Sequence, residues 1–160
     1  DCFLAAEQVG PQGSVIGIDF TQEMIDRATG NAAKVGLENV SFRLGDIEAL
    51  RLEDGSADAV ISNCVINLAP DKDAVFREAH RVLRPGGRLM VSDILLTRPA
   101  TEEEMQDMSL RSGCISGSLP AEEYAGKVRA AGFEDVRVSE QPELEDGTFW
   151  YSASVSARKV

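Results

Sequence analysis

The chain alternates between short apolar runs and longer stretches in which apolar residues recur at helical spacing. The short runs are bounded by Gly, Pro and polar turn residues, which is typical of strands, whereas the longer amphipathic stretches are typical of helices. Strands are predicted over residues 15–19, 40–44, 57–61, 88–95, 136–140 and 149–158. Helices are predicted over residues 1–9, 21–35, 71–83 and 121–131, and a further helix begins near residue 101.

The order of these elements predicts an α/β fold with a doubly wound, mostly parallel sheet, because helices separate most of the strands. Residues 84–87, Arg-Pro-Gly-Gly, are expected to form a turn before the fourth strand. Only residues 141–148 separate the last two strands, so these should pair antiparallel at one edge of the sheet. No repeat, low-complexity tract or linker divides the sequence, and residues 1–160 are interpreted as a single domain.

Residues typical of helix caps mark the ends of two predicted helices. Thr21 is placed to cap the second helix, and Gly36 is placed to end it. Thr101 and Glu104 have the spacing of a capping box, and the acidic run that includes Glu104 suits the positive end of a helix dipole.

A cysteine stands at the end of a predicted strand. The strand 57–61 is apolar enough to be buried, and it runs into Ser-Asn-Cys-Val-Ile-Asn-Leu at residues 62–68. Ligands bind at strand ends in open α/β sheets, so Cys64 is a candidate functional thiol, with a buried inert cysteine as the alternative. Cys114 lies in residues 111–119, a segment rich in Gly and Ser where a core cysteine would be out of place.

Charge and cysteine content narrow the possible functions. The formal charge of −11 disfavours nucleic acid and anionic membranes as partners, because both would be repelled. The three cysteines are widely spaced and odd in number, unlike a secreted disulfide framework, which indicates a reducing, cytoplasmic location. The absence of a CxxC pair disfavours structural zinc, and the single histidine, His80, lies within a predicted helix as a packing or solvated residue.

Asp19 ends one predicted strand and precedes a helix. A carboxylate in this position can accept hydrogen bonds from the hydroxyls of a ribose, as it does in dinucleotide-binding folds. An ordinary polar residue at a strand end is the alternative, and the pattern alone does not separate the two.

The order of elements resembles the Rossmann-type S-adenosylmethionine-dependent methyltransferases, and the resemblance covers nearly the whole chain. The matching features are the strand ending in Asp19, the Gly45–Asp46 loop, the strand ending near Asn63, the turn at 83–87 and the closing antiparallel pair. Within this group the cysteines resemble those of the arsenite methyltransferases. Their contexts are residues 62–68 around Cys64, Gly-Cys-Ile-Ser-Gly around Cys114 and Asp-Cys-Phe around Cys2.

This resemblance implies S-adenosylmethionine as the cofactor. The residues it assigns to cofactor binding are Asp19, Phe20, Met24, Asp46, Ile47, Glu48 and Asn63. Asp19 would hold the ribose, and Ile47 would lie against the adenine ring with Asp46 or Glu48 near its amino group. Phe20 and Met24 would pack against the adenosine, with core packing as the alternative.

The resemblance also implies that Cys64 and Cys114 hold As(III), a soft ion that favours thiolate ligands and gains affinity from chelation. Cys2, near a helix start, would be a third ligand, a redox partner of Cys64 or a packed residue; a redox role is favoured. Methylation formally oxidises arsenic, so two electrons must return. A protein disulfide regenerated by small thiols or thioredoxin would supply them.

Two other functions compete with arsenite methylation. A methyltransferase of the same fold could act on another small organic molecule, with incidental cysteines. A non-catalytic thiol protein could instead bind arsenite or another soft metal. The family places a strand and a glycine-rich loop just before the position of Asp1, so we expect a domain incomplete at its N-terminus and a gap in the sheet beside residues 15–19.

Overall fold

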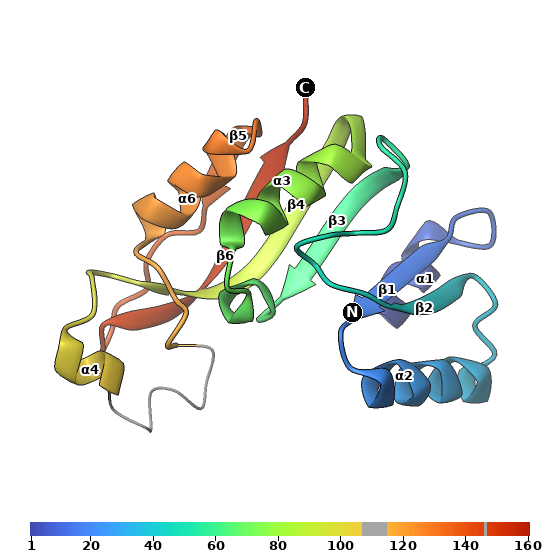
Figure 1. The fold of residues 1–160 in the computed structure, drawn as a ribbon, viewed down its shortest axis with the longest axis horizontal. Coiled ribbons are helices and arrows are strands. Elements are labelled where there is room, and N and C mark those ends of the chain that lie inside the picture. The colour runs from blue at the N-terminus through green and yellow to red at the C-terminus, as the bar shows by residue number, and fades with distance from the viewer. Residues whose placement is uncertain (107–114, 146) are drawn as a thin grey trace. The chain divides into compact units, whose positions relative to one another are not determined.

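The structure is a computed structural model that describes residues 1–106, 115–145 and 147–160. The chain divides into two compact units, Asp1–Arg51 and Leu52–Val160 (Figure 1). Within the described ranges, no helix is both long enough and apolar enough to cross a membrane.

The first unit contains two helices and two parallel strands. Its elements are α1 (Cys2–Val9), β1 (Val15–Asp19), α2 (Gln22–Val35) and β2 (Val40–Leu44). The rings of Phe3 and Phe42 meet edge-to-face at 6.2 Å. Asn39 Nδ2 donates to the carbonyl oxygens of Ala6 (2.8 Å) and Gly10 (2.9 Å), which satisfies acceptors at the end of α1 and fixes that end to the start of β2.

Gly17 allows close packing across β1. A Cβ atom at this position would lie 2.5 Å from Cδ1 of Phe42 and 3.2 Å from Sγ of Cys2. The Phe42 ring therefore approaches the strand more closely than a residue with a Cβ would permit, and Cys2 Sγ would be in tight contact with such a Cβ.

The second unit is a four-stranded mixed sheet with helices. Its elements are β3 (Ala57–Asn63), the 3-10 turn η1 (Ile66–Leu68), α3 (Lys72–Val82), β4 (Leu83–Leu96), α4 (Glu102–Gln106), α6 (Ala121–Ala130), β5 (Glu134–Val138) and β6 (Trp150–Arg158). The strand order is β3-β4-β6-β5, with β3 parallel to β4 and both pairs of β6 antiparallel. The antiparallel edge pair expected from the sequence is confirmed, although β5 begins and ends two residues earlier than predicted.

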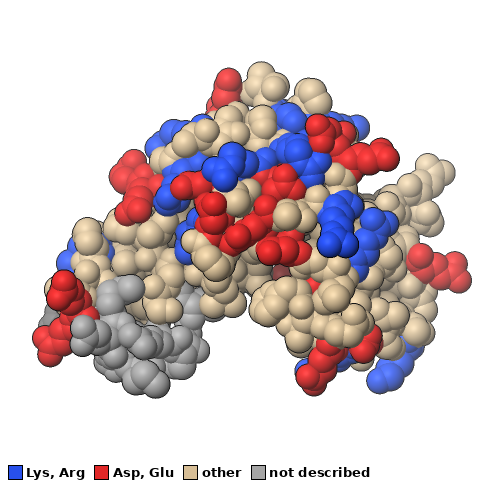
Figure 2. Space-filling view, viewed as in Figure 1, with Lys and Arg blue, Asp and Glu red and all other residues tan. Residues whose placement is uncertain are grey.

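Helices α3 and α6 cover one face of this sheet (Figure 1). Alternate residues of β4 and β6 point into the core on that face, where Phe76 of α3 and Tyr124 of α6 meet edge-to-face at 5.3 Å. His80 packs in the same way against Phe133 at 5.1 Å, which confirms a packing role. Figure 2 shows acidic and basic side chains intermixed over α3, in keeping with ion pairs such as Lys127–Asp73 at 3.0 Å.

Three local predictions were wrong. Strand β3 is not buried, because it is an edge strand of the four-stranded sheet and Ile61 is 45% exposed. The turn predicted at residues 84–87 does not precede the strand but lies inside β4, as an irregularity that the pairing with β3 skips, with Gly86 at φ +82° and Gly86 N donating to Lys159 O at 2.7 Å. Thr21 precedes α2 without capping it through its side chain.

The capping box was predicted correctly. Thr101 N donates to Glu104 Oε2 at 2.8 Å, and Glu104 N donates to Thr101 Oγ1 at 3.2 Å. In the described ranges β1 pairs only with β2, and the strands form two sheets, which agrees with the gap expected beside residues 15–19.

Candidate functional site

Cys64 follows the last residue of β3 and is held in an unusual backbone conformation. Its φ angle is +57°, in the left-handed region, and its backbone N–H donates to Ser92 O at 2.8 Å. A residue with a Cβ in this conformation costs about 1 kcal/mol or more relative to glycine. Such strain concentrates at functional sites. Cys64 is exposed, so the alternative of a buried inert cysteine is wrong.

A buried polar cluster lies next to the turn that follows Cys64. Asp93 on β4 is fully buried and accepts hydrogen bonds from Ile94 N (3.0 Å) and Asn67 N (3.2 Å), while Tyr124 Oη lies 3.4 Å away. Burial raises the pKa of Asp93, and these hydrogen bonds together with nearby Lys72 oppose the shift. The cluster therefore links β4, α6 and the turn after Cys64.

In the first unit, the end of β1 and the loop after β2 lie together. Gly45 N donates to Asp19 O at 2.9 Å, which places the 45–48 loop beside the end of β1. Asp19 Oδ1 accepts from Thr21 N at 2.8 Å, so this carboxylate also orders the start of α2. Asp46 Oδ1 accepts from Glu48 N at 2.9 Å, which folds the loop back on itself.

Phe20 and Met24 are not core residues. Phe20 is 75% exposed and Met24 is 48% exposed, so core packing, the alternative for both, is wrong. Ile47 and Glu48 are half-buried in their loop. Asn63, the last residue of β3, is exposed and belongs to the second unit.

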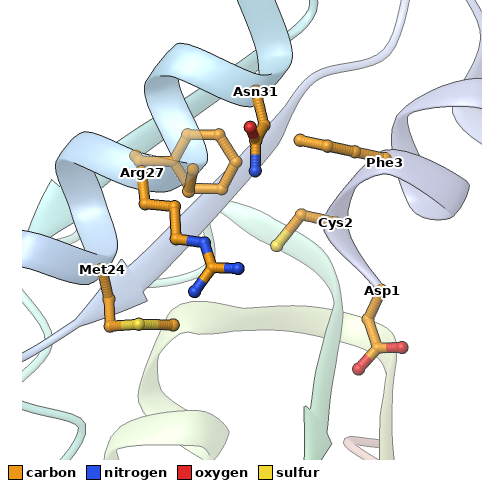
Figure 3. Close-up of a pocket in the computed structure, with 8 residues that line it drawn as sticks. Asp1, Cys2, Phe3, Met24, Arg27 and Asn31 are labelled. Carbon is orange, nitrogen blue, oxygen red and sulfur yellow. The ribbon is translucent and has the colours of Figure 1, made fainter. Parts of the chain in front are cut away.

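A cavity of about 250 Å³ lies between α1, α2 and β2 of the first unit. Figure 3 shows the sulfur of Cys2, the guanidinium of Arg27 and the Met24 side chain directed into the same space. Its lining is Asp1, Cys2, Phe3, Met24, Arg27, Ala28, Asn31 and Phe42. The structure thus brings Cys2 and Met24 together in one cavity.

The three cysteines differ in their exposure and in where they lie in the chain. Cys2 is a half-buried free thiol of the first unit, whereas Cys64 is exposed and belongs to the second unit. Cys114 lies outside the described residues. Within those residues, no grouping of three or more His, Cys, Asp or Glu side chains could hold a metal ion.

Sequence reasoning missed the cluster around Asp93. A lone carboxylate within the apolar run of β4 was an available signal, because a buried charge needs partners. Arg27 and Asn31, which line the cavity, gave no such signal, because both occupy ordinary positions on an amphipathic helix.

Comparison with known proteins identifies the family. Residues 1–139 match the family model described as a methyltransferase domain. The chain belongs to this family.

Its relatives include named arsenite methyltransferases. That of Halobacterium salinarum is 44% identical over 170 residues, covering 99% of this chain and 44% of its own length. That of Aquipseudomonas alcaligenes is 45% identical over 150 residues, covering 89% of this chain and 43% of its own length. The resemblance found in the sequence is confirmed, and this methyltransferase-domain chain spans less than half the length of these curated relatives.

Solved structures confirm the α/β methyltransferase fold. The arsenic(III) S-adenosylmethionine methyltransferase of Chlamydomonas reinhardtii superposes with a TM-score of 0.89 at 36% identity, covering 100% of this chain and 60% of that one. The geranyl diphosphate C-methyltransferase of Streptomyces coelicolor superposes with a TM-score of 0.81 at 14% identity, which supports the fold alone.

Proposed function

We propose that this chain is part of an S-adenosylmethionine-dependent enzyme that methylates thiol-bound arsenite. The observation that carries the proposal is the exposed Cys64 thiol, held in a left-handed backbone conformation at the end of β3. Relatives named arsenite methyltransferases support a soft-ion substrate for this thiol.

The residues at the end of β1 suit an adenosine group. Asp19 uses one carboxylate oxygen to order Thr21, and a carboxylate has further lone pairs for ribose hydroxyls. The exposed ring of Phe20 and the half-exposed Met24 offer apolar surface to a base or ribose. The Asp46–Glu48 loop, folded beside Asp19 by the Gly45 hydrogen bond, would contact the adenine, and Asn63 would contribute from β3.

In this proposal the protein mainly holds and orients its substrates. S-adenosylmethionine, when bound, supplies an electrophilic methyl group for the lone pair of As(III). Cys64 and Cys114 hold the arsenic as a chelate, and Cys2 or a small thiol such as glutathione supplies a further sulfur. Arsenic becomes formally pentavalent, and two thiols that oxidise to a disulfide return it to As(III).

The proposed reaction requires a reducing compartment. Small thiols or thioredoxin would reduce the disulfide, and the reducing cytoplasm supplies both. The free thiol of Cys2 suits such a compartment.

Native mass spectrometry with arsenite tests the proposal on this chain. We expect one arsenic per chain, lost in Cys64→Ser and in Cys114→Ser, with formation of S-adenosylhomocysteine by the full-length protein dependent on arsenite. Ser62→Ala, two positions before Cys64 in the sequence, is the matched control and should retain the arsenic. Binding that is indifferent to both cysteine substitutions would overturn the proposal. Tight arsenite binding without any cofactor binding would favour a non-catalytic thiol protein instead.

A further inference from the structure

The turn that follows Cys64 is fastened to three consecutive residues of β4. The backbone N–H of Cys64 donates to Ser92 O at 2.8 Å. Three positions later, Asn67 donates through its backbone N–H to Asp93 Oδ2 at 3.2 Å and through its side-chain Nδ2 to Ile94 O at 2.7 Å. Strand β4 therefore fixes both ends of this short turn.

One of these contacts uses a side chain that is unfavourable to bury. Asp93 is 0% exposed, and its two oxygens accept from the backbone N–H groups of Ile94 at 3.0 Å and Asn67 at 3.2 Å. A carboxylate removed from water destabilises a protein unless its partners compensate, and an apolar side chain of similar volume often serves stability as well. An apolar side chain could not accept the Asn67 N–H, so the carboxylate adds a specific link between two segments that are 26 residues apart.

The backbone of Cys64 requires a link of this kind. Its φ of +57° is unfavourable for a residue with a Cβ, and such conformations persist where the surrounding structure holds them. Rotation about φ turns the chain after Cys64 relative to the N–H of Cys64. That N–H is bonded to Ser92, and the chain after it is bonded to Asp93 through Asn67. The two hydrogen bonds lie on either side of the rotation and oppose it.

We propose that Asp93 is a positioning residue that holds Cys64 in its left-handed conformation and so fixes the direction of the thiol at the end of β3. The far end of the same turn is anchored separately, because Lys72 Nζ donates to Asn67 O and to Ala69 O, both at 3.2 Å. The inference deepens the proposed function and rests on it for its purpose, since a thiol that presents arsenic for methyl transfer must be held in one orientation.

A double-mutant cycle tests the inference without arsenic. Cys64→Gly and Cys64→Ala both lack the thiol but differ in their tolerance of a positive φ. With Asp93 present, the ratio of their unfolding equilibrium constants should be about fivefold in favour of glycine. Asp93→Leu and Asp93→Ala both remove the acceptor of the Asn67 N–H, so the turn can relax and the ratio should fall below about twofold in each. Urea unfolding is measured in a fixed concentration of trimethylamine N-oxide, which keeps weakened variants folded at the start.

Two further backgrounds are the matched controls. Tyr124→Phe removes a hydroxyl that lies 3.4 Å from Asp93 Oδ2 but leaves the hydrogen bond to Asn67 in place. Val82→Ala opens a cavity at a fully buried residue just before the start of β4, far along the strand from Ser92. Distant substitutions act independently of each other, so both controls should keep the fivefold ratio of about the parent chain.

The inference would be overturned by a ratio that stays near fivefold in the Asp93 variants, or that falls as far in either control. Equal stability of the glycine and alanine chains with Asp93 present would also overturn it, because no strained conformation would then be held. With the natural cysteines in place, Asp93→Leu should weaken arsenite binding about fivefold, because the fraction of chains in the binding conformation falls. Unchanged affinity would again overturn the inference. If the parent chain bound no arsenite while the ratio fell as expected, the proposed function would fail and the role of Asp93 would stand.

Discussion

The phenol oxygen of Tyr124 lies 3.4 Å from Oδ2 of Asp93, and both side chains are completely buried. Burial raises the pKa of both groups, and the nearby Asp93 charge raises that of Tyr124 further. A carboxyl with a raised pKa makes stability depend on pH in a direction opposite to that of a typical salt-bridged carboxylate.

The first prediction concerns Asp93→Asn. Between the ordinary value of 3.8 and the raised folded-state pKa, the folded chain binds the proton more tightly, so this group's contribution to stability falls as pH rises. The asparagine variant has no such dependence. Its free energy of unfolding, relative to the parent chain, should therefore grow as the pH rises above 3.8, and should level off once the parent carboxyl has lost its proton. Urea unfolding at several pH values measures this, and exposed Glu143→Gln is the control. A difference independent of pH would contradict the prediction.

The second prediction concerns the backbone strain at Cys64. Cys64→Gly and Cys64→Ala both remove the thiol, but only glycine relieves the φ of +57°. The glycine variant should be more stable than the alanine variant by about 1 kcal/mol. Chemical unfolding of the two variants, side by side, gives the difference. If alanine proved as stable as glycine, the left-handed conformation would not be a source of strain.

A third prediction compares two glycines of the first unit. Gly17→Ala places a Cβ 2.5 Å from the Phe42 ring and should destabilise the unit by about 1–3 kcal/mol. Gly30→Ala, in the middle of α2 where a Cβ meets nothing within 4 Å, should stabilise it by about 0.5–1 kcal/mol. Hydrogen exchange of the β1 and α2 amides measures the change in stability of the first unit in both variants. Changes of the same sign would contradict the packing described across β1.

The fourth prediction concerns the pKa of Glu104. Hydrogen bonds from Arg98 and from the backbone of Thr101 lower this pKa to about 2. A lowered pKa means that the carboxylate supports the start of α4 above the ordinary value of 4.5 and that this support is lost as pH falls toward 2. In Arg98→Met the pKa should move back toward 4.5, which carbon-detected NMR of the carboxyl group follows. Glu103→Gln should leave the Glu104 titration in place.

Local pattern predicted the fold well because each strand and helix is marked in its own residues. The Thr101–Glu104 capping box and the strand ending in Asp19 depend on spacings of a few positions, and both formed as expected. The exposure of β3 could not be predicted in this way, because burial of a strand depends on its neighbours in the sheet. The apolar run of residues 57–61 fits an edge strand as well as a central one.

The cluster around Asp93, to which Asn67 belongs, could not be predicted for a related reason. Asn67 meets Asp93 across 26 residues and Ser118 across 51, and no local spacing encodes such contacts. The left-handed φ of Cys64 was also beyond reach, since the residues that favour this conformation are glycine and asparagine. The thiol itself, by contrast, was identifiable from its place at the end of a strand.

The conformation of Cys64 bears on how this position can change in evolution. Cysteine and glycine have neighbouring codons, and the backbone at residue 64 favours glycine over any side chain. If stability of the fold were the only requirement, substitutions at this site would therefore favour glycine. The cysteine in this sequence therefore stands where folding alone would favour glycine, as expected if the sulfur atom itself is needed.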